Sequence, residues 1–421
     1  MSTLTTPLQP GGQRPDAPTR VAILLLSSLT VMAGATIAAT LPSVQKAFAG
    51  TEGAPWLTRL LLTLPALFIG LGAPFAGVVI DRFGRRRLLL IGLVLYALAG
   101  SSGYYLRFLG LESLPLLLAG RALLGLAVAA LMTTATTLIG DYFSGAARDR
   151  FFGQQGAVMA GGGLVYITLG GALAGVDWHL PFLIYALPLA LLPLVAAKIT
   201  EPQAAEASAA SQAPPIQLRQ LPLDRLLLIY ATSFLAMSFF FLVPVQIPFF
   251  VEDVLNGTPF QAGIALGTGT ATATLMAMSY GRLRRWLRFP SVYVLCFGMT
   301  GLGFLWISQV TAYAEVLMAL LVVGVGFGLL MPNSNLWLTS LAPVAYRGRL
   351  VSLLTAAAFL GQFASPLFAQ PLLKVLSLSE LFLTAGLAGL VLAGGMLLYA
   401  KTNSPSKQTA TEIASPGSSS G

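Results

Sequence analysis

Twelve long stretches without a single charged residue are the feature that most constrains this chain of 421 residues. Each stretch is 19 to 31 residues long, which suffices for the roughly 20-residue helix that crosses a ~30 Å hydrocarbon core. Charged residues make up only 9% of the chain, against about 25% in a soluble protein, so an ordinary soluble fold is excluded. The strands of an outer-membrane barrel need only about 10 residues and alternate apolar with polar positions, which these stretches do not. We therefore predict an all-α integral membrane protein with twelve transmembrane helices, over residues 21–45, 60–80, 88–106, 122–140, 151–176, 178–197, 226–251, 254–281, 289–314, 316–346, 350–373 and 381–400.

The positive charges predict the orientation of these helices. An even number of spans places both termini on one side, and that side carries 19 of the 24 Lys and Arg residues. The opposite side carries only Lys46, Arg107 and Lys374, while Arg59 and Arg121 lie inside spans. Because cytoplasmic loops are enriched in Lys and Arg, we expect both termini in the cytoplasm. The net charge of +9 is then a topology signal, and we expect a lipid bilayer rather than a nucleic acid as the partner.

Two halves of the chain correspond to each other. The stretch 201–224 is rich in Ala, Pro, Gln and Ser, a composition typical of linkers, and it separates six predicted spans from six. A basic loop follows the second span at Gly77 and the eighth at Gly281, and a second pair of basic motifs lies at Arg148 and Arg347, with offsets of 204 and 199 residues. Internal repeats of this kind are typical of transporters. We predict six-helix bundles at 20–200 and 225–401, with disordered cytoplasmic ends at 1–19 and 402–421.

The loop after the second span, GVVIDRFGRRR, carries a specific resemblance. It resembles the G-x-x-x-D-R-x-G-R-R signature of the major facilitator superfamily (MFS), and the likeness extends over essentially the whole chain. The resemblance implies two pseudo-symmetric bundles and a cytoplasmic latch that favours the outward-open state, in which Asp81, Arg85 and Asp141 form a charge relay. Alternatively, the arginines only determine topology. The expected latch comprises Gly77, Asp81, Arg82, Gly84, Arg85, Arg86 and Asp141.

The fourth span resembles a second family signature, R-x-x-x-G, at Arg121 and Gly125. An arginine in hydrocarbon is costly and is normally paired or faces a watery cavity. The family often pairs it with an acid of the first span, but residues 21–45 contain no carboxylate. Arg121 is therefore either satisfied by backbone carbonyls and by hydroxyls such as Thr30 or Thr36, or free to hold an anionic substrate.

The fifth span has a glycine-rich face at Gly163, Gly170 and Gly171. Small residues allow close helix packing, which is the simpler interpretation, and the resemblance implies a hinge between the bundles at the same surface. The Gly-Pro pair that many antiporters of the family carry ahead of the Gly-Gly pair is replaced here by Tyr166 and Ile167.

Candidates for the substrate path lie where prolines interrupt the seventh and tenth spans, because interrupted helices free backbone polar groups near the midplane. No carboxylate lies well inside a span, so a proton carrier would have to come from the span edges, where Glu252, Asp253, Glu315 and Glu380 join Asp81 and Asp141. The expected cavity residues are Thr30, Thr36, Phe240, Gln246, Asn333 and Asn335.

These observations predict a secondary active transporter that works by alternating access. We expect a monomer in the bacterial cytoplasmic membrane that exports small lipophilic or amphipathic compounds with proton coupling. One alternative is an importer or facilitator of an organic anion bound at Arg121. Another is a membrane sensor or partner-binding protein that transports nothing. No arrangement of residues indicates an enzyme, a cofactor or a metal site.

Overall fold

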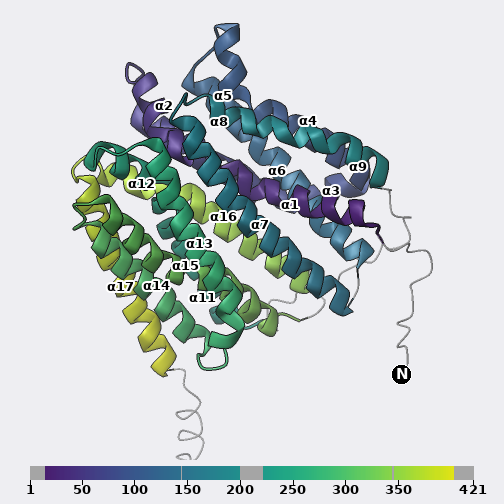
Figure 1. Ribbon diagram of the computed structural model, residues 1–421. Coiled ribbons are helices and arrows are strands. Elements are labelled where there is room, and N and C mark those ends of the chain that lie inside the picture. The colour runs from purple at the N-terminus through teal and green to yellow at the C-terminus, as the bar shows by residue number, and fades with distance from the viewer. Residues whose placement is uncertain (1–14, 144, 200–220, 344–345, 403–421) are drawn as a thin grey trace, which may run out of the picture.

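The computed structural model describes residues 15–143, 145–199, 221–343 and 346–402. The side chains of residues 73, 74, 76–79, 81, 146 and 149 are outside this description. Throughout the described ranges the chain forms helices, as predicted from the uncharged stretches. Figure 1 shows two groups of long helices, one from each half of the sequence.

The first half forms the bundle that we call the N bundle. Its helices are α1 (Ala17–Ala35), η1 (Ala38–Thr40), α2 (Leu41–Ala47), α3 (Ala54–Phe83), α4 (Arg85–Gly100), α5 (Ser102–Tyr105), η2 (Leu106–Leu109), α6 (Leu114–Tyr142), α7 (Gly145–Ala174), α8 (Leu180–Leu183), η3 (Ile184–Leu191) and α9 (Leu192–Lys198).

The second half forms the C bundle. Its helices are α11 (Leu223–Phe240), α12 (Leu242–Phe249), the π-helical turn η5 (Phe250–Val254), α13 (Pro259–Leu283), α14 (Phe289–Ile307), α15 (Tyr313–Leu341), α16 (Arg347–Leu372) and α17 (Leu378–Thr402).

Local sequence explains where several helices begin and where spans break. The Asp16 side chain accepts a hydrogen bond from the backbone N–H of Thr19 and caps α1, and Thr258 with Gln261 forms a capping box at α13. Between α3 and α4, Gly84 has φ +81°, a backbone conformation that L side chains rarely adopt. Pro188 lies inside η3, so the sixth predicted span is built from short helical pieces.

Ten helices of the described residues are long and apolar enough to cross a membrane, or eleven if the bent pair Arg85–Gly100 and Ser102–Leu109 is one span. The remaining predicted span corresponds to α13, which has 25 residues but many glycines and threonines. These residues lower the mean hydropathy of α13. They do not interrupt the helix, because the threonine hydroxyls donate to the carbonyl four residues earlier, as they do at Thr268, Thr270, Thr272 and Thr274. The all-helical fold is confirmed, and hydropathy alone misses this packed helix.

Several predicted boundaries need correction. Helix α1 begins at Ala17 and α11 at Leu223, each before the predicted start of its bundle, and α17 continues to Thr402. The side chain of Asp16 explains the first shift, because a cap extends a helix into polar sequence. The predicted disordered stretches 1–19 and 402–421, and the linker at 201–224, otherwise lie mostly outside the described residues.

The two bundles meet at one end of the molecule, where α2 and α12 lie, and Figure 1 shows them diverging away from it. Helix α3 packs against α16, α7 packs against α13, and α12 packs against both η1 and α2. We call this end the closed end. Residues Ala17 and Thr402 lie at the other end, which we call the terminal end.

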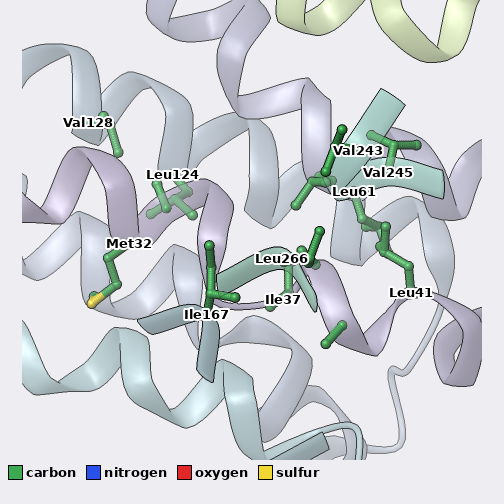
Figure 2. Packing of buried hydrophobic residues seen from close by; sticks show 14 of the residues in the cluster. Met32, Ile37, Leu41, Leu61, Leu124, Val128, Ile167, Val243, Val245 and Leu266 are labelled. Atoms are coloured by element: carbon green, nitrogen blue, oxygen red, sulfur yellow. The ribbon is translucent and has the colours of Figure 1, made fainter. Parts of the chain in front are cut away.

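Apolar packing joins the bundles at the closed end. A single buried cluster includes Ile37 and Leu61 of the N bundle together with Val243, Val245 and Leu266 of the C bundle (Figure 2). A second buried cluster, which includes Ile229, Phe297 and Trp337, consists of C-bundle residues alone. The first cluster is therefore shared by the two bundles.

Candidate gates and substrate path

Arg59 is the central polar contact of the closed end. It lies on α3, and its relative exposure is only 6%. Its Nε donates to Oε1 of Gln246 on α12 at 3.1 Å, and its Nη1 donates to Oε1 of Gln45 on α2 at 2.7 Å. The guanidinium carbon also lies 3.9 Å from the centroid of the Phe249 ring, a cation–π contact. A buried arginine is thus held by neutral groups, two of which belong to the other bundle.

Ion pairs connect the bundles beside Arg59. The ammonium of Lys46 on α2 lies 3.5 Å from Glu252 and 3.6 Å from Asp253, both on η5. The lysine side chain is 65% exposed and that of Glu252 only 6%, and Oε1 of Glu252 is buried without a partner among the described residues. The pair therefore joins an exposed ammonium of the N bundle to a buried carboxylate of the C bundle. Separating the bundles at this end would expose the Glu252 carboxylate.

Neighbouring glycines of α7 face different partners. A Cβ placed on Gly170 would collide with the backbone carbonyl of Thr36 at the end of α1, within the N bundle. A Cβ on Gly171 would lie 2.9 Å from Cα of Gly263 on α13, across the bundle interface. Gly163 packs against Val31 of α1 in the same way. The small residues therefore permit close packing, which is the simpler of the two predicted roles, and Gly171 does so between the bundles.

Arg121 lies inside the N bundle and has no exposed surface. Its Nε donates to the backbone carbonyl of Leu61 at 2.7 Å, and its Nη2 donates to the carbonyl of Ala33. Its guanidinium carbon is 5.3 Å from the Tyr185 ring centroid, and the Tyr185 hydroxyl also donates to Ala33. Gly125, one turn further along α6, packs directly on the backbone of Pro65.

Backbone carbonyls accept from two nitrogens of Arg121, but its Nη1 is buried with no hydrogen-bond partner among the described residues. The hydroxyls of Thr30 and Thr36 make no hydrogen bond to the guanidinium among those that the structure describes. Thr36 is fully buried and donates to the carbonyl of Met32, while Thr30 is half-buried. An anionic substrate could not reach the guanidinium in this conformation without repacking α1, α3 and α6.

The predicted latch lies at the terminal end. The Nε of Arg85, at the start of α4, donates to Oδ2 of Asp141, near the end of α6, at 2.7 Å. The two side chains are 15% and 24% exposed. Arg86 donates to the carbonyl of Ala196 on α9, while Arg82 is exposed in the last turn of α3. The surroundings of Gly77 and the side chain of Asp81 are not among the parts that the structure describes, so the role of both residues in the latch stays a prediction.

The remaining four candidates for the substrate path lie in four different settings. Gln246 is fully buried and bonds Arg59, so it belongs to the closed end. Asn333 is fully buried in the C bundle in this conformation, where it donates to the Phe289 carbonyl at 3.1 Å and accepts from the Tyr280 hydroxyl, so its place in the cavity stays a prediction. Asn335 is exposed on α15. Phe240 is half-buried and stacks on Phe327 of α15.

Sequence analysis did not single out Arg59 as a functional candidate. The residue lies at the edge of an uncharged stretch, where a charge is easily interpreted as interfacial. A signal was nevertheless present, because α3 extends five residues before Arg59 and a charge inside a spanning helix is a functional candidate by default. Gln45 and Gln370, which lie near it, gave no signal because a glutamine at a span edge is common.

The geometry defines a class of protein: two six-pass helical bundles that contact each other through separable side-chain contacts, as in a membrane transporter. Residues 23–366 match the model of the Major Facilitator Superfamily, and the chain belongs to this family. Its fold and its family are those of transporters rather than enzymes.

Relatives of this chain include resistance proteins. It is 28% identical over 354 residues to the class G tetracycline resistance protein of Vibrio anguillarum, covering 82% of this chain and 87% of that protein. It is 26% identical over 279 residues to multidrug resistance protein 1 of Bacillus subtilis (strain 168), covering 64% of this chain and 69% of that protein.

Solved structures agree on the fold. A D-xylose-proton symporter aligns with a TM-score of 0.71 and 19% identity, over 90% of this chain and 96% of that one. A POT family transporter in complex with 5-aminolevulinic acid aligns with a TM-score of 0.72 and 13% identity, over 91% and 96%. At these identities the likeness establishes the fold alone.

Proposed function

We propose that this protein is a secondary active exporter of small lipophilic or amphipathic compounds in the bacterial cytoplasmic membrane, working as a monomer by alternating access. The observation that carries the proposal is the closed end, where the bundles meet through separable contacts around Arg59 and Lys46. Relatives whose names denote multidrug and tetracycline resistance support the direction of export.

The distribution of Lys and Arg supports the orientation that we propose. With 19 of these residues on the side of the termini, the terminal end faces the cytoplasm. The closed end is then the outer end, and the conformation is inward-facing. Compounds would enter between the bundles from the cytoplasm or the inner leaflet, and would leave after the contacts at Arg59, Lys46 and Gly171 separate.

Proton coupling is part of the proposal, and Glu252 is the carboxylate that the geometry supports best as carrier. Its side chain is almost inaccessible in this conformation, and its pairing with Lys46 joins the two bundles. When the outer contacts separate, the carboxylate would reach water and exchange a proton. A buried acid whose environment changes between two conformations can couple proton movement to the transition.

The first test is accumulation of a panel of fluorescent lipophilic dyes in efflux-deficient bacteria that express this protein, with and without a protonophore. Energised export lowers accumulation, and the protonophore restores it. Asp81→Asn, which removes a predicted latch contact, should also restore accumulation at equal expression. Unchanged accumulation across the panel would contradict multidrug export and favour a dedicated substrate.

A second test concerns the carrier. Glu252→Gln should abolish uphill export while retaining exchange of labelled for unlabelled substrate in proteoliposomes, because exchange needs no net proton movement. Glu380→Gln is the matched control, since Glu380 is an exposed carboxylate that accepts hydrogen bonds from Ser377 at the start of α17. Full uphill export by Glu252→Gln would contradict the assignment of Glu252 as carrier.

A further inference from the structure

A pocket separate from the proposed substrate path lies at the closed end. Its volume is about 480 Å³, and its walls come from α2 and α3 of the N bundle and from α16, α17 and their connection in the C bundle. The polar residues that line it are Gln45, Arg59, Gln370 and Lys374. No carboxylate is among the lining residues.

Hydrogen-bond donors dominate the polar wall. The Arg59 guanidinium is buried beneath the pocket, and its Nη2 makes no hydrogen bond with the described residues. Gln370 is only 7% exposed, and its Nε2 has no hydrogen-bond partner in the part of the chain that the structure describes. A buried amide donor without a partner is costly, so a ligand that accepts its hydrogen bond would gain affinity. Lys374 adds an exposed ammonium at the rim, which forms no ion pair with described residues.

Apolar side chains form the rest of the wall. Trp56 is half-buried near the start of α3, and Leu373, Leu376 and Leu378 face it from the C bundle. The combination of two cations, a free amide donor and apolar walls suits a ligand with an anionic head and a short apolar body.

We propose that this pocket binds a small amphipathic anion, whose phosphate or carboxylate head is held by Arg59, Gln370 and Lys374. The head could belong to a free solute or to an anionic lipid, since the chemistry that recognises it is the same. Because the walls come from both bundles, the ligand bridges α3 and α16. It therefore stabilises the conformation in which the two bundles are in contact at the closed end, and it inhibits the transport cycle from that side.

The proposal does not depend on which compound the protein exports. Binding to the pocket can be measured without any transport substrate. Asp253 is the acid whose negative charge acts on Arg59, but it is not among the lining residues and it forms an ion pair with Lys46. The charge balance of the pocket itself therefore remains positive.

The test uses the full chain in nanodiscs of neutral phosphatidylcholine, with monobutyl phosphate as the probe and n-butanol as its uncharged counterpart. Butyl phosphate should raise the temperature of thermal unfolding in a saturable way and should change the fluorescence of Trp56, whereas butanol should do neither. Lys374→Gln and Gln370→Leu should each weaken binding about tenfold, the loss expected for one charge-assisted or buried hydrogen bond.

Lys401→Gln is the matched control, because it removes one exposed lysine at the opposite end of α17. It should leave the affinity for butyl phosphate unchanged. Lys374 is exposed, so its variant should unfold at the same temperature as the parent when no ligand is present. Equal affinity in the parent, Lys374→Gln and Gln370→Leu would overturn the proposal, as would an equal response to butanol.

A second arm identifies the source of the anion. Nanodiscs that contain phosphatidylglycerol should already stabilise the parent, but not Lys374→Gln, if a lipid head occupies the pocket, and added butyl phosphate should then have little effect. If the physiological ligand is a solute, phosphatidylglycerol should change neither stability nor the affinity for butyl phosphate. A stabilisation by phosphatidylglycerol that Lys374→Gln and Gln370→Leu retain would place the lipid elsewhere and overturn the proposal for lipids.

Discussion

Arg59 and Arg121 are both arginines buried in membrane-spanning helices, yet the structure uses them in opposite ways. Arg121 donates to backbone carbonyls of α1 and α3 within one bundle. Arg59 also donates to the Pro55 carbonyl of its own helix, but its other partners are the side chains of Gln45, Gln246 and Phe249, which are divided between the two bundles. Backbone acceptors hold parts that move as one body, whereas side-chain acceptors can rotate away when two bodies separate. The location of an arginine relative to the moving interface thus decides its role.

The largest effect is expected for Arg121→Met. Two hydrogen bonds from a charged donor disappear from a fully buried site, so we expect the free energy of unfolding to fall by about 3 kcal/mol. Thermal unfolding of the purified protein measures this loss, and transport of neutral and anionic substrates should decline together. Normal stability with a selective loss of anion transport would instead support Arg121 as an anion site.

Arg59→Met should have a smaller effect on folding and a larger effect on the conformational equilibrium. The closed end loses its bonds to Gln45 and Gln246, so the population with a separated outer end should rise about tenfold, which corresponds to 1.4 kcal/mol. A cysteine at the buried position Val44, in a Cys296→Ser background, reports this population by its rate of thiol labelling. Labelling at the parental rate would show that Arg59 does not hold the closed end.

The adjacent glycines of α7 provide the same comparison without charge. Gly170→Ala presses on the α1 backbone within the N bundle and should lower the unfolding temperature. Gly171→Ala presses on α13 across the interface, so it should mainly raise labelling at Val44→Cys. Gly161→Ala is the control, because a Cβ there meets open space. Equal effects of both substitutions on stability would contradict this division.

The smallest effect concerns the connection between α7 and α8. Burial raises the pKa of Asp177, but the backbone N–H and side chain of His179 and the Arg107 guanidinium outweigh it and hold the pKa at about 2, below the usual 3.8. The ionised Asp177 carboxylate therefore contributes to the free energy of unfolding. This contribution is fully present above pH 3.8 and is lost as the pH falls through about 2. Unfolding temperatures between pH 5 and pH 2 should therefore depend less on pH in Asp177→Asn, and an unchanged dependence would contradict the contribution of Asp177.

Much of the fold could be predicted because the bilayer enforces it. An uncharged stretch of about 20 residues in hydrocarbon must be helical to satisfy its own backbone, whatever surrounds it. The pair Arg85–Asp141 was predictable from the resemblance, since each lies at a helix end beside a recognisable motif. The partners of Asn333 could not be predicted, because the direction in which a side chain of α15 points depends on how α13 and α14 pack against it.

The sequence by itself determined that this chain lies in a membrane as helices, that it consists of two related halves and that its charges are concentrated on the side of the termini. These properties follow from composition and local order, which act on each segment separately. Only the tertiary structure decided which buried arginine contacts both bundles, which glycine meets the opposite bundle and where the Gln370 amide finds no partner among the described residues. Such contacts join segments from opposite halves, and their energies depend on how whole helices dock.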